Sequence, residues 1–103
     1  VMGVPQHEVM QVATMMGQKL TINEFVAYSE LIKVKEVLSP KALAIASFAL
    51  CGFANFSSVG IQIGGIGELA PSRRADLAKL GLKALLCGTL ASYLSATIAG
   101  MLM

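Results

Sequence analysis

Charged residues are scarce in this sequence, and tryptophan is absent. Only 14% of the 103 residues are charged, whereas a soluble domain usually carries about a quarter. The net charge of +2 is small and dispersed, and no array of arginine and aromatic residues is present, so nucleic acid is not an expected partner. The composition argues against an ordinary soluble domain.

Cysteine and histidine are also rare. Cys51 and Cys87 lie in apolar surroundings without a partner at metal-ligand spacing, so we expect two small buried hydrophobes, no metal site and no organic cofactor. His7, the single histidine, is more simply an interfacial residue than a proton carrier. The serines lack a Gly-x-Ser-x-Gly elbow, and the sequence does not predict an enzyme.

What the chain has is long uncharged segments. Hydrophobic residues make up 55% of it and the mean hydropathy is +0.71. The windows Ala42–Gly67 and Ala84–Met103 contain no charge. As a straight helix the first window would extend about 39 Å, against a hydrocarbon core of about 30 Å, while the second is just long enough to cross. We therefore predict an all-α membrane protein in contact with the lipid bilayer, in which the first segment tilts or breaks.

A polar interruption lies in the middle of the first window. Gly52 in a helix interior costs about 1 kcal/mol relative to alanine, and Asn55 at membrane depth needs hydrogen-bond partners. We therefore predict a broken transmembrane helix over residues 40–69, started by Ser39 as N-cap and Pro40 at the first helical position.

Such a break has two interpretations. Unwound helix near the midplane is how many secondary transporters bind polar substrates and coupling ions. Alternatively, Asn55, Ser57 and Ser58 merely hydrogen-bond a neighbouring helix. The following glycine-rich run, 60–65, has the GxxxG spacing typical of close helix packing.

Two short helical patterns precede this segment. One stops near Gly17, a plausible C-cap, and the other runs from Thr21 to about Ile32. Each would be about 17 Å long, which is half a membrane. The pattern predicts a re-entrant helical hairpin over residues 5–32, a form allowed where protein or water covers its tip; an amphipathic hairpin on the membrane surface is the alternative.

Glu24 lies near the tip of this predicted hairpin. Its spacing from Thr21 is that of a capping box, which would explain it as a helix start. An acid at membrane depth is also a candidate for handling substrate or protons. The two roles are compatible.

The last part of the sequence predicts one more membrane helix, over residues 72–103. Ser72 would cap it, and the charged stretch Arg73–Lys83 predicts an amphipathic start of this helix at the level of the lipid headgroups. Basic residues over 68–83 slightly favour a cytoplasmic location for this loop, with the C-terminus outside. The opening Val1 and the presence of only two spans suggest a fragment of a larger multi-pass protein.

Three stretches resemble the C-terminal part of the concentrative nucleoside transporter family, in the order and spacing of a bacterial member. They cover Asn23–Tyr28 (NEFVAY), Ala49–Ile61 (ALCGFANFSSVGI) and Pro71–Asp76 (PSRRAD). The resemblance extends over nearly the whole chain, and the combination of the first two motifs is highly specific.

The resemblance implies a nucleoside symporter of the bacterial plasma (inner) membrane, driven by protons or sodium. It implies a homotrimer in which a transport domain moves like an elevator. By motif, Glu24, Asn55 and Ser58 would bind the ribose hydroxyls, and Phe53 would lie beside the ligand. Base recognition and the main coupling-ion site would precede Val1. The alternative is a membrane-embedded packing segment without a ligand of its own.

Overall fold

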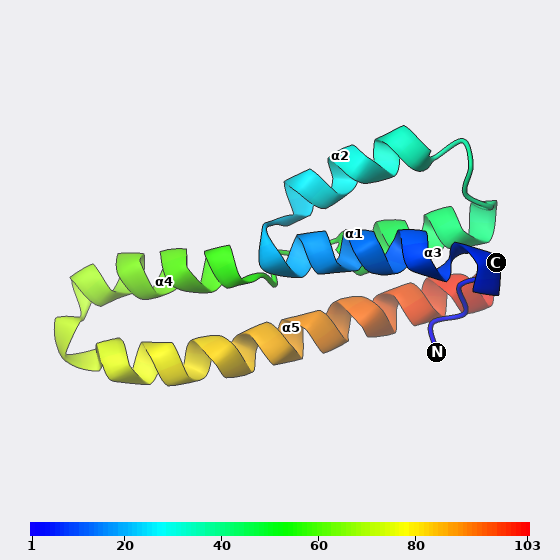
Figure 1. Ribbon diagram of the computed structural model, residues 1–103. Helices are drawn as coiled ribbons and strands as arrows, with labels where there is room; N and C mark the ends of the chain where they lie inside the picture. Colours follow the sequence, from blue (N-terminus) through cyan, green and yellow to red (C-terminus); the bar gives the residue numbers. More distant parts are fainter.

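The computed structural model describes all 103 residues, Val1–Met103, and its regular structure is entirely helical (Figure 1). The all-helical prediction is therefore confirmed. Five α-helices follow one another, with a short 3₁₀ turn before the first and another before the last: η1 (Gln6–Glu8), α1 (Val9–Thr21), α2 (Glu24–Val34), α3 (Pro40–Leu50), α4 (Phe56–Leu69), η2 (Pro71–Arg73) and α5 (Arg74–Leu102).

The helices α1 and α2 form a hairpin that packs against α3, while α4 continues beyond α3 and α5 returns along both (Figure 1). The tip of the hairpin lies beside the gap between α3 and α4. The hairpin is short, with helices of 13 and 11 residues, or about 20 and 17 Å. It therefore extends alongside only part of the length of α5 (Figure 1).

The predicted boundaries inside the hairpin are wrong by a few residues. Helix α1 passes through Gly17 and ends at Thr21, whose hydroxyl donates to the Gly17 carbonyl at 2.7 Å. Helix α2 is capped by Asn23 instead of Thr21, because the Asn23 carboxamide oxygen accepts from the Val26 N–H at 3.0 Å. Asn23 ranks among the best N-cap residues, and the Thr21 hydroxyl is already engaged.

The predicted interruption of the first uncharged window is confirmed. Helix α3 starts as expected, with the Ser39 hydroxyl oxygen accepting from the Ala42 N–H at 3.2 Å. The chain leaves the helix after Leu50 and resumes it at Phe56. Within the break Gly52 has φ of +117°, a conformation that side chains disfavour.

Helix α5 is the one element long and apolar enough to cross a membrane by itself. Together with η2 it forms a helical stretch, Pro71–Leu102, with a mean hydropathy of 1.6 over its most apolar window, whereas α3 is apolar but only 11 residues long. The predicted Ser72 cap is wrong: Ser72 lies inside η2, and α5 begins at Arg74 without a side-chain cap.

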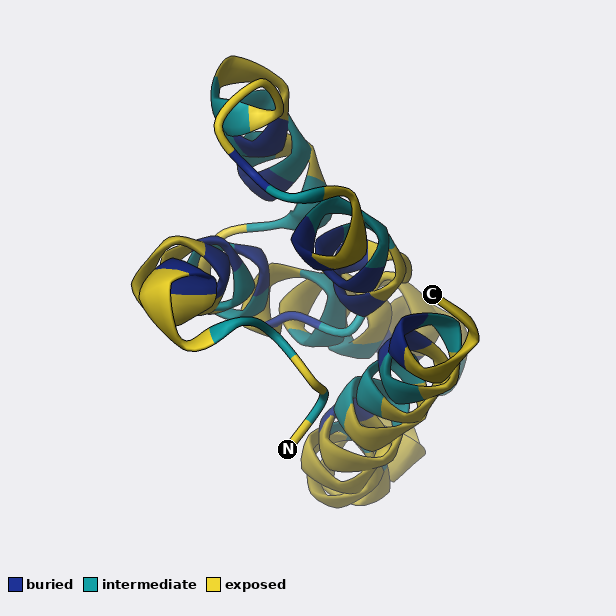
Figure 2. Cartoon of the chain, turned by 90° about the vertical axis from the view of Figure 1, so that its right-hand side faces the viewer, coloured by how far each residue is buried: buried dark blue, intermediate teal, exposed yellow.

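The core lies where the hairpin meets α3, and a second small cluster joins α3 to α5. Most of α5 and α4 is exposed in this chain (Figure 2). The buried apolar residues of the two clusters are Val12, Met15, Ala27, Leu31, Leu38, Ala42, Ala46 and Leu50, then Ile45, Ala49 and Ala96.

Two packing expectations differ from the structure. Cys51 and Cys87 are exposed, because one lies in the unwound segment and the other on a face of α5 that no other helix of the chain covers. The Gly60, Gly64 and Gly65 positions have open space around them. The predicted close packing of this glycine run is therefore not made within these 103 residues.

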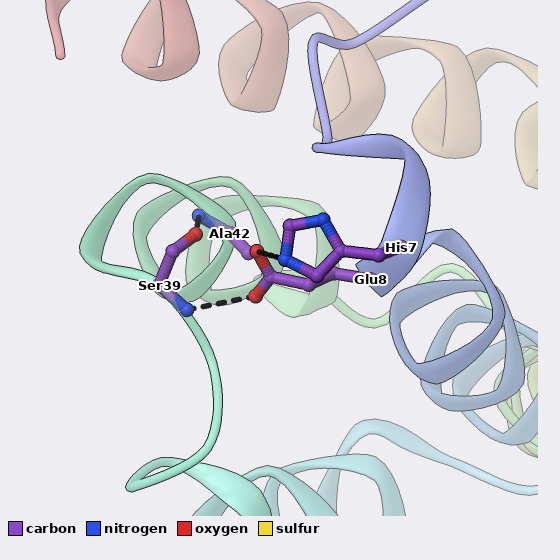
Figure 3. Close-up of polar contacts among 4 residues, drawn as sticks. All are labelled: His7, Glu8, Ser39 and Ala42. Atoms are coloured by element: carbon purple, nitrogen blue, oxygen red, sulfur yellow. Dashed lines mark hydrogen bonds and ion pairs between the residues drawn. The ribbon is translucent and has the colours of Figure 1, made fainter.

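The base of the hairpin is attached to the start of α3 (Figure 3). The Glu8 carboxylate is 3% exposed and accepts from the Ser39 backbone N–H at 2.7 Å. This hydrogen bond holds the pKa of Glu8 below its ordinary value, and the positive N-terminal end of α3 favours the same charge. His7 contacts Glu8 at 3.4 Å while its own side chain is exposed, so it lies at the base and not at the tip.

Candidate functional site

The candidate site lies where the hairpin tip meets the break between α3 and α4. Asn55 is 1% exposed, and its side-chain amide donates to a carboxylate oxygen of Glu24 at 3.1 Å. Glu24 is the first residue of α2 and Asn55 is the N-cap of α4. The N-terminal ends of two helices thus converge on one carboxylate, and their partial positive charges stabilise it.

Asn55 also organises the start of α4. Its carboxamide oxygen accepts from the backbone N–H of Ser58 at 2.7 Å, and its own N–H donates to the Phe53 carbonyl at 3.0 Å. One buried side chain therefore fixes the unwound segment on one side and the new helix on the other.

Glu24 and Ser58 retain hydrogen-bonding capacity. Glu24 is half-buried and accepts one side-chain hydrogen bond in this chain, from Asn55, while a carboxylate has about four acceptor sites. The Ser58 hydroxyl, also half-buried, has no hydrogen bond within the chain. The site can therefore accept hydrogen bonds from hydroxyl groups of a ligand through Glu24 and donate one through Ser58.

Phe53 projects from the unwound segment and is 76% exposed. With Ser58 it lines the end of a groove of about 450 Å³ between α4 and α5, whose other walls are mostly apolar. Gln62, one helical turn beyond Ser58, is the other polar side chain of this groove. Sequence reasoning did not single out Gln62, although its i, i+4 spacing from Ser58 places both on one helix face.

The structure thus brings Glu24, Asn55 and Ser58 together in one hydrogen-bonded unit, with Phe53 two residues from Asn55. What these residues bind stays a prediction. No group of three His, Cys, Asp or Glu side chains is close enough to hold a metal ion.

Sequence reasoning missed Lys19, which is 2% exposed. Its ammonium donates to the Ala49 carbonyl at 3.2 Å and to the Ser92 hydroxyl at 3.4 Å. The signal was present, because Val12, Met15 and Lys19 follow the spacing of one helix face and all three are buried. A lysine continuing an apolar stripe indicates a charge that faces the protein interior.

Comparison with known proteins gives this geometry its context. Residues 1–100 match the family model described as the Na+-dependent nucleoside transporter C-terminus. The chain is 61% identical over 99 residues to the uncharacterized transporter YutK of Bacillus subtilis, covering 96% of the chain and 24% of YutK. It is 48% identical over 103 residues to the putative nucleoside permease NupX of Escherichia coli, covering 97% of the chain and 25% of NupX.

The chain is also similar in structure to a solved transporter. The chain superposes with a TM-score of 0.90 on CNTnw in an inward-facing substrate-bound state, at 48% identity, over 96% of the chain and 25% of CNTnw. The chain therefore spans about a quarter of the length of these relatives, which are transporters and not enzymes. With a family model matched over nearly its whole length and relatives this similar, the chain belongs to the concentrative nucleoside transporter family and corresponds to its C-terminal part.

Proposed function

We propose that the full-length protein takes up nucleosides across a membrane and that this segment binds the ribose. The observation that carries the proposal is the hydrogen bond from Asn55 to Glu24 at the convergence of two helix N-termini. It joins two of the three motifs by which the chain resembles nucleoside transporters.

The chemistry of ribose fits the hydrogen-bonding groups of this site. Its vicinal hydroxyls donate well to a carboxylate such as Glu24, and they exchange hydrogen bonds with hydroxyl and amide groups such as those of Ser58 and Asn55. Phe53, exposed at the edge of the site, offers an aromatic face to the sugar or base. A site that pairs both hydroxyls rejects analogues that lack them.

The arrangement of the helices supports the wider proposal of alternating access. The hairpin over residues 5–32 would enter the membrane to about half its depth, with its tip covered by the α3–α4 break and by α5. The broken helix, 40–69, and the last helix, 72–103, would cross it. Irregular backbone at that depth is tolerated where protein or a water-filled cavity covers it. An elevator-type movement, a homotrimer and a bacterial inner-membrane location complete the proposal.

Coupling to protons or sodium belongs to the same proposal, with the main ion site outside these residues. Helix ends and unwound carbonyls are the groups that hold coupling cations in broken helices. In this chain the carbonyls at the end of α3 already have protein donors, among them Lys19 and Tyr28.

A second candidate function rests on the glycine-rich part of α4. Gly60, Gly64 and Gly65 present an open face, and small residues let membrane helices approach closely. On this alternative the segment packs against other parts of the protein and has no ligand of its own.

An uptake measurement separates the two. The full-length protein in sealed vesicles would be tested for uptake of labelled uridine, as wild type and as Glu24→Gln and Ser58→Ala. The matched control is Glu30→Gln, an acid on the same helix paired with Lys33 at the surface. We expect both site variants to lose most uptake while the control keeps it and all remain inserted. Uptake unchanged in both site variants would contradict ribose binding here and favour the packing function.

A further inference from the structure

Lys19 is a buried charge that the proposed ribose contacts do not use. At 2% exposure within this chain, Lys19 is covered by the chain itself. Burying an ammonium costs several kcal/mol unless hydrogen bonds and an opposite charge compensate it. The contacts of Lys19 show where this compensation comes from.

The first compensation is the C-terminal end of α3. The last carbonyls of a helix have no partner within it and carry a partial negative charge. In α3 the Ala49 carbonyl accepts from Lys19 at 3.2 Å, and the Ser47 carbonyl accepts from the Tyr28 hydroxyl at 2.7 Å. Both donors come from the hairpin, so the hairpin caps the C-terminal end of α3.

The second compensation reaches the unwound segment through α5. The Ser92 hydroxyl, 3.4 Å from the Lys19 nitrogen, donates in turn to the Cys51 carbonyl at 3.0 Å. Ser92 also borders the position that a side chain on Gly52 would occupy, at 3.3 Å. Lys19 is therefore connected to the last turn of α3 directly and, through Ser92, to the first residue after it.

Glu24, five residues after Lys19, is the acid on the other side of the hairpin tip. Lys19 and Glu24 stand on opposite sides of the hairpin tip, at the end of α1 and the start of α2. Asn55, which donates to Glu24, comes four residues after Cys51, the last residue connected to Lys19.

We propose that Lys19 is a positioning residue of the ribose site: it fixes the end of α3 and the segment 51–55 so that Asn55 meets Glu24. This inference rests on the proposed function. It predicts that loss of the ammonium specifically impairs discrimination between nucleosides with and without ribose hydroxyls. A residue that only fills space would affect both kinds of ligand equally.

The test measures dissociation constants of uridine and 2′,3′-dideoxyuridine for the purified full-length protein by calorimetry. Lys19→Met removes the charge and keeps much of the side-chain volume. Lys33→Met, which makes the same change on the exposed side of α2, is the control. The ratio of interest is the dissociation constant of 2′,3′-dideoxyuridine divided by that of uridine. We expect this ratio to fall roughly tenfold or more in Lys19→Met, since the loss of well-placed hydrogen bonds has this magnitude. It should stay unchanged in Lys33→Met.

A second variant keeps the inference testable if Lys19→Met does not fold. Ser92→Ala removes only the link from Lys19 to Cys51, and we expect it to lower the ratio in the same direction by a smaller factor. The inference is wrong if Lys19→Met and Ser92→Ala, where they fold, leave the ratio unchanged. It is also wrong if the binding of both ligands weakens by the same factor. In either case Lys19 is a packing residue.

Glu24→Gln in the same assay separates this inference from the proposed function. If Glu24→Gln lowers the ratio and the Lys19 and Ser92 variants do not, only the role of Lys19 is overturned. If Glu24→Gln leaves the ratio unchanged, ribose binding fails and the Lys19 inference fails with it. If Lys19 acts through Glu24, the double variant should lose less than the sum of the two single effects on a free-energy scale.

Discussion

Asn55 and Glu24, 31 positions apart in the sequence, are joined by a hydrogen bond of 3.1 Å. Each residue also starts a helix, α4 in one case and α2 in the other. The geometry of the hairpin tip and that of the helix break are therefore interdependent, and a change in either residue should be felt by both elements.

Asn55→Asp should separate the capping role of Asn55 from its contact with Glu24. Aspartate caps a helix about as well as asparagine, so α4 should still form. Two carboxyl groups at hydrogen-bond distance repel each other when both are charged, and we expect the full-length variant to lose most uridine uptake at neutral pH. Asn55→Ala, which also removes the cap, should additionally lower the melting temperature. Normal uptake by Asn55→Asp would show that the amide contact is dispensable.

Gly52→Ala should destabilise the protein by roughly 1–3 kcal/mol, because residues other than glycine are strained at such backbone angles. The new methyl group would also stand 3.3 Å from the Ser92 hydroxyl. The matched change Gly17→Ala, inside α1 with nothing within 4 Å, should instead stabilise the protein by about 0.5–1 kcal/mol. Melting temperatures of the purified full-length variants measure both; equal shifts would contradict the assignment of the Gly52 conformation.

Glu8 should make the stability of the folded protein decline at acidic pH. Its pKa is lowered in the folded protein by the Ser39 N–H, so its stabilising contribution is complete above the ordinary value of 4.5 and is lost as the pH falls through the lowered value. Glu8→Gln should reduce the melting temperature near pH 7 and flatten its decline under acid. Glu36→Gln, at an exposed acid without an ion pair, should leave the decline as in wild type.

Gly64→Leu should reveal whether the open face of α4 contacts another part of the full-length protein. If the face is covered there, a leucine would prevent close approach, and sizing in detergent should show disrupted assembly. A surface that stays open in the complete protein would tolerate the leucine with an unchanged elution profile. Ile61→Leu, at a 70% exposed position on the same helix, is the control for Gly64→Leu.

The break in the first uncharged window was predictable because Gly52 and Asn55 are both unfavourable inside an apolar helix. The capping of α3 by Ser39 was predictable because it depends on local sequence alone. The exact start of α2 was not, since Thr21 and Asn23 are both suitable cap residues and the choice depends on how the hairpin packs.

The partnership of Asn55 with Glu24 came from motif resemblance and not from spacing, because contacts between residues far apart in sequence leave no periodic signal. Lys19 was missed for a related reason. Its burial follows from the Val12–Met15 stripe of α1, but its partners Ala49 and Ser92 come from α3 and α5. A lone lysine in a sequence does not indicate which carbonyls it will find.

The ammonium at the end of α3 has one more consequence. A sodium ion bound to such carbonyls would dissociate whenever its concentration fell, whereas the ammonium that donates to the Ala49 carbonyl is part of the hairpin itself. The unwound segment should therefore keep its shape when the external salt is replaced by an inert osmolyte. This part of the protein would then be indifferent to the ion gradient, and the response to that gradient would originate elsewhere in the full-length chain.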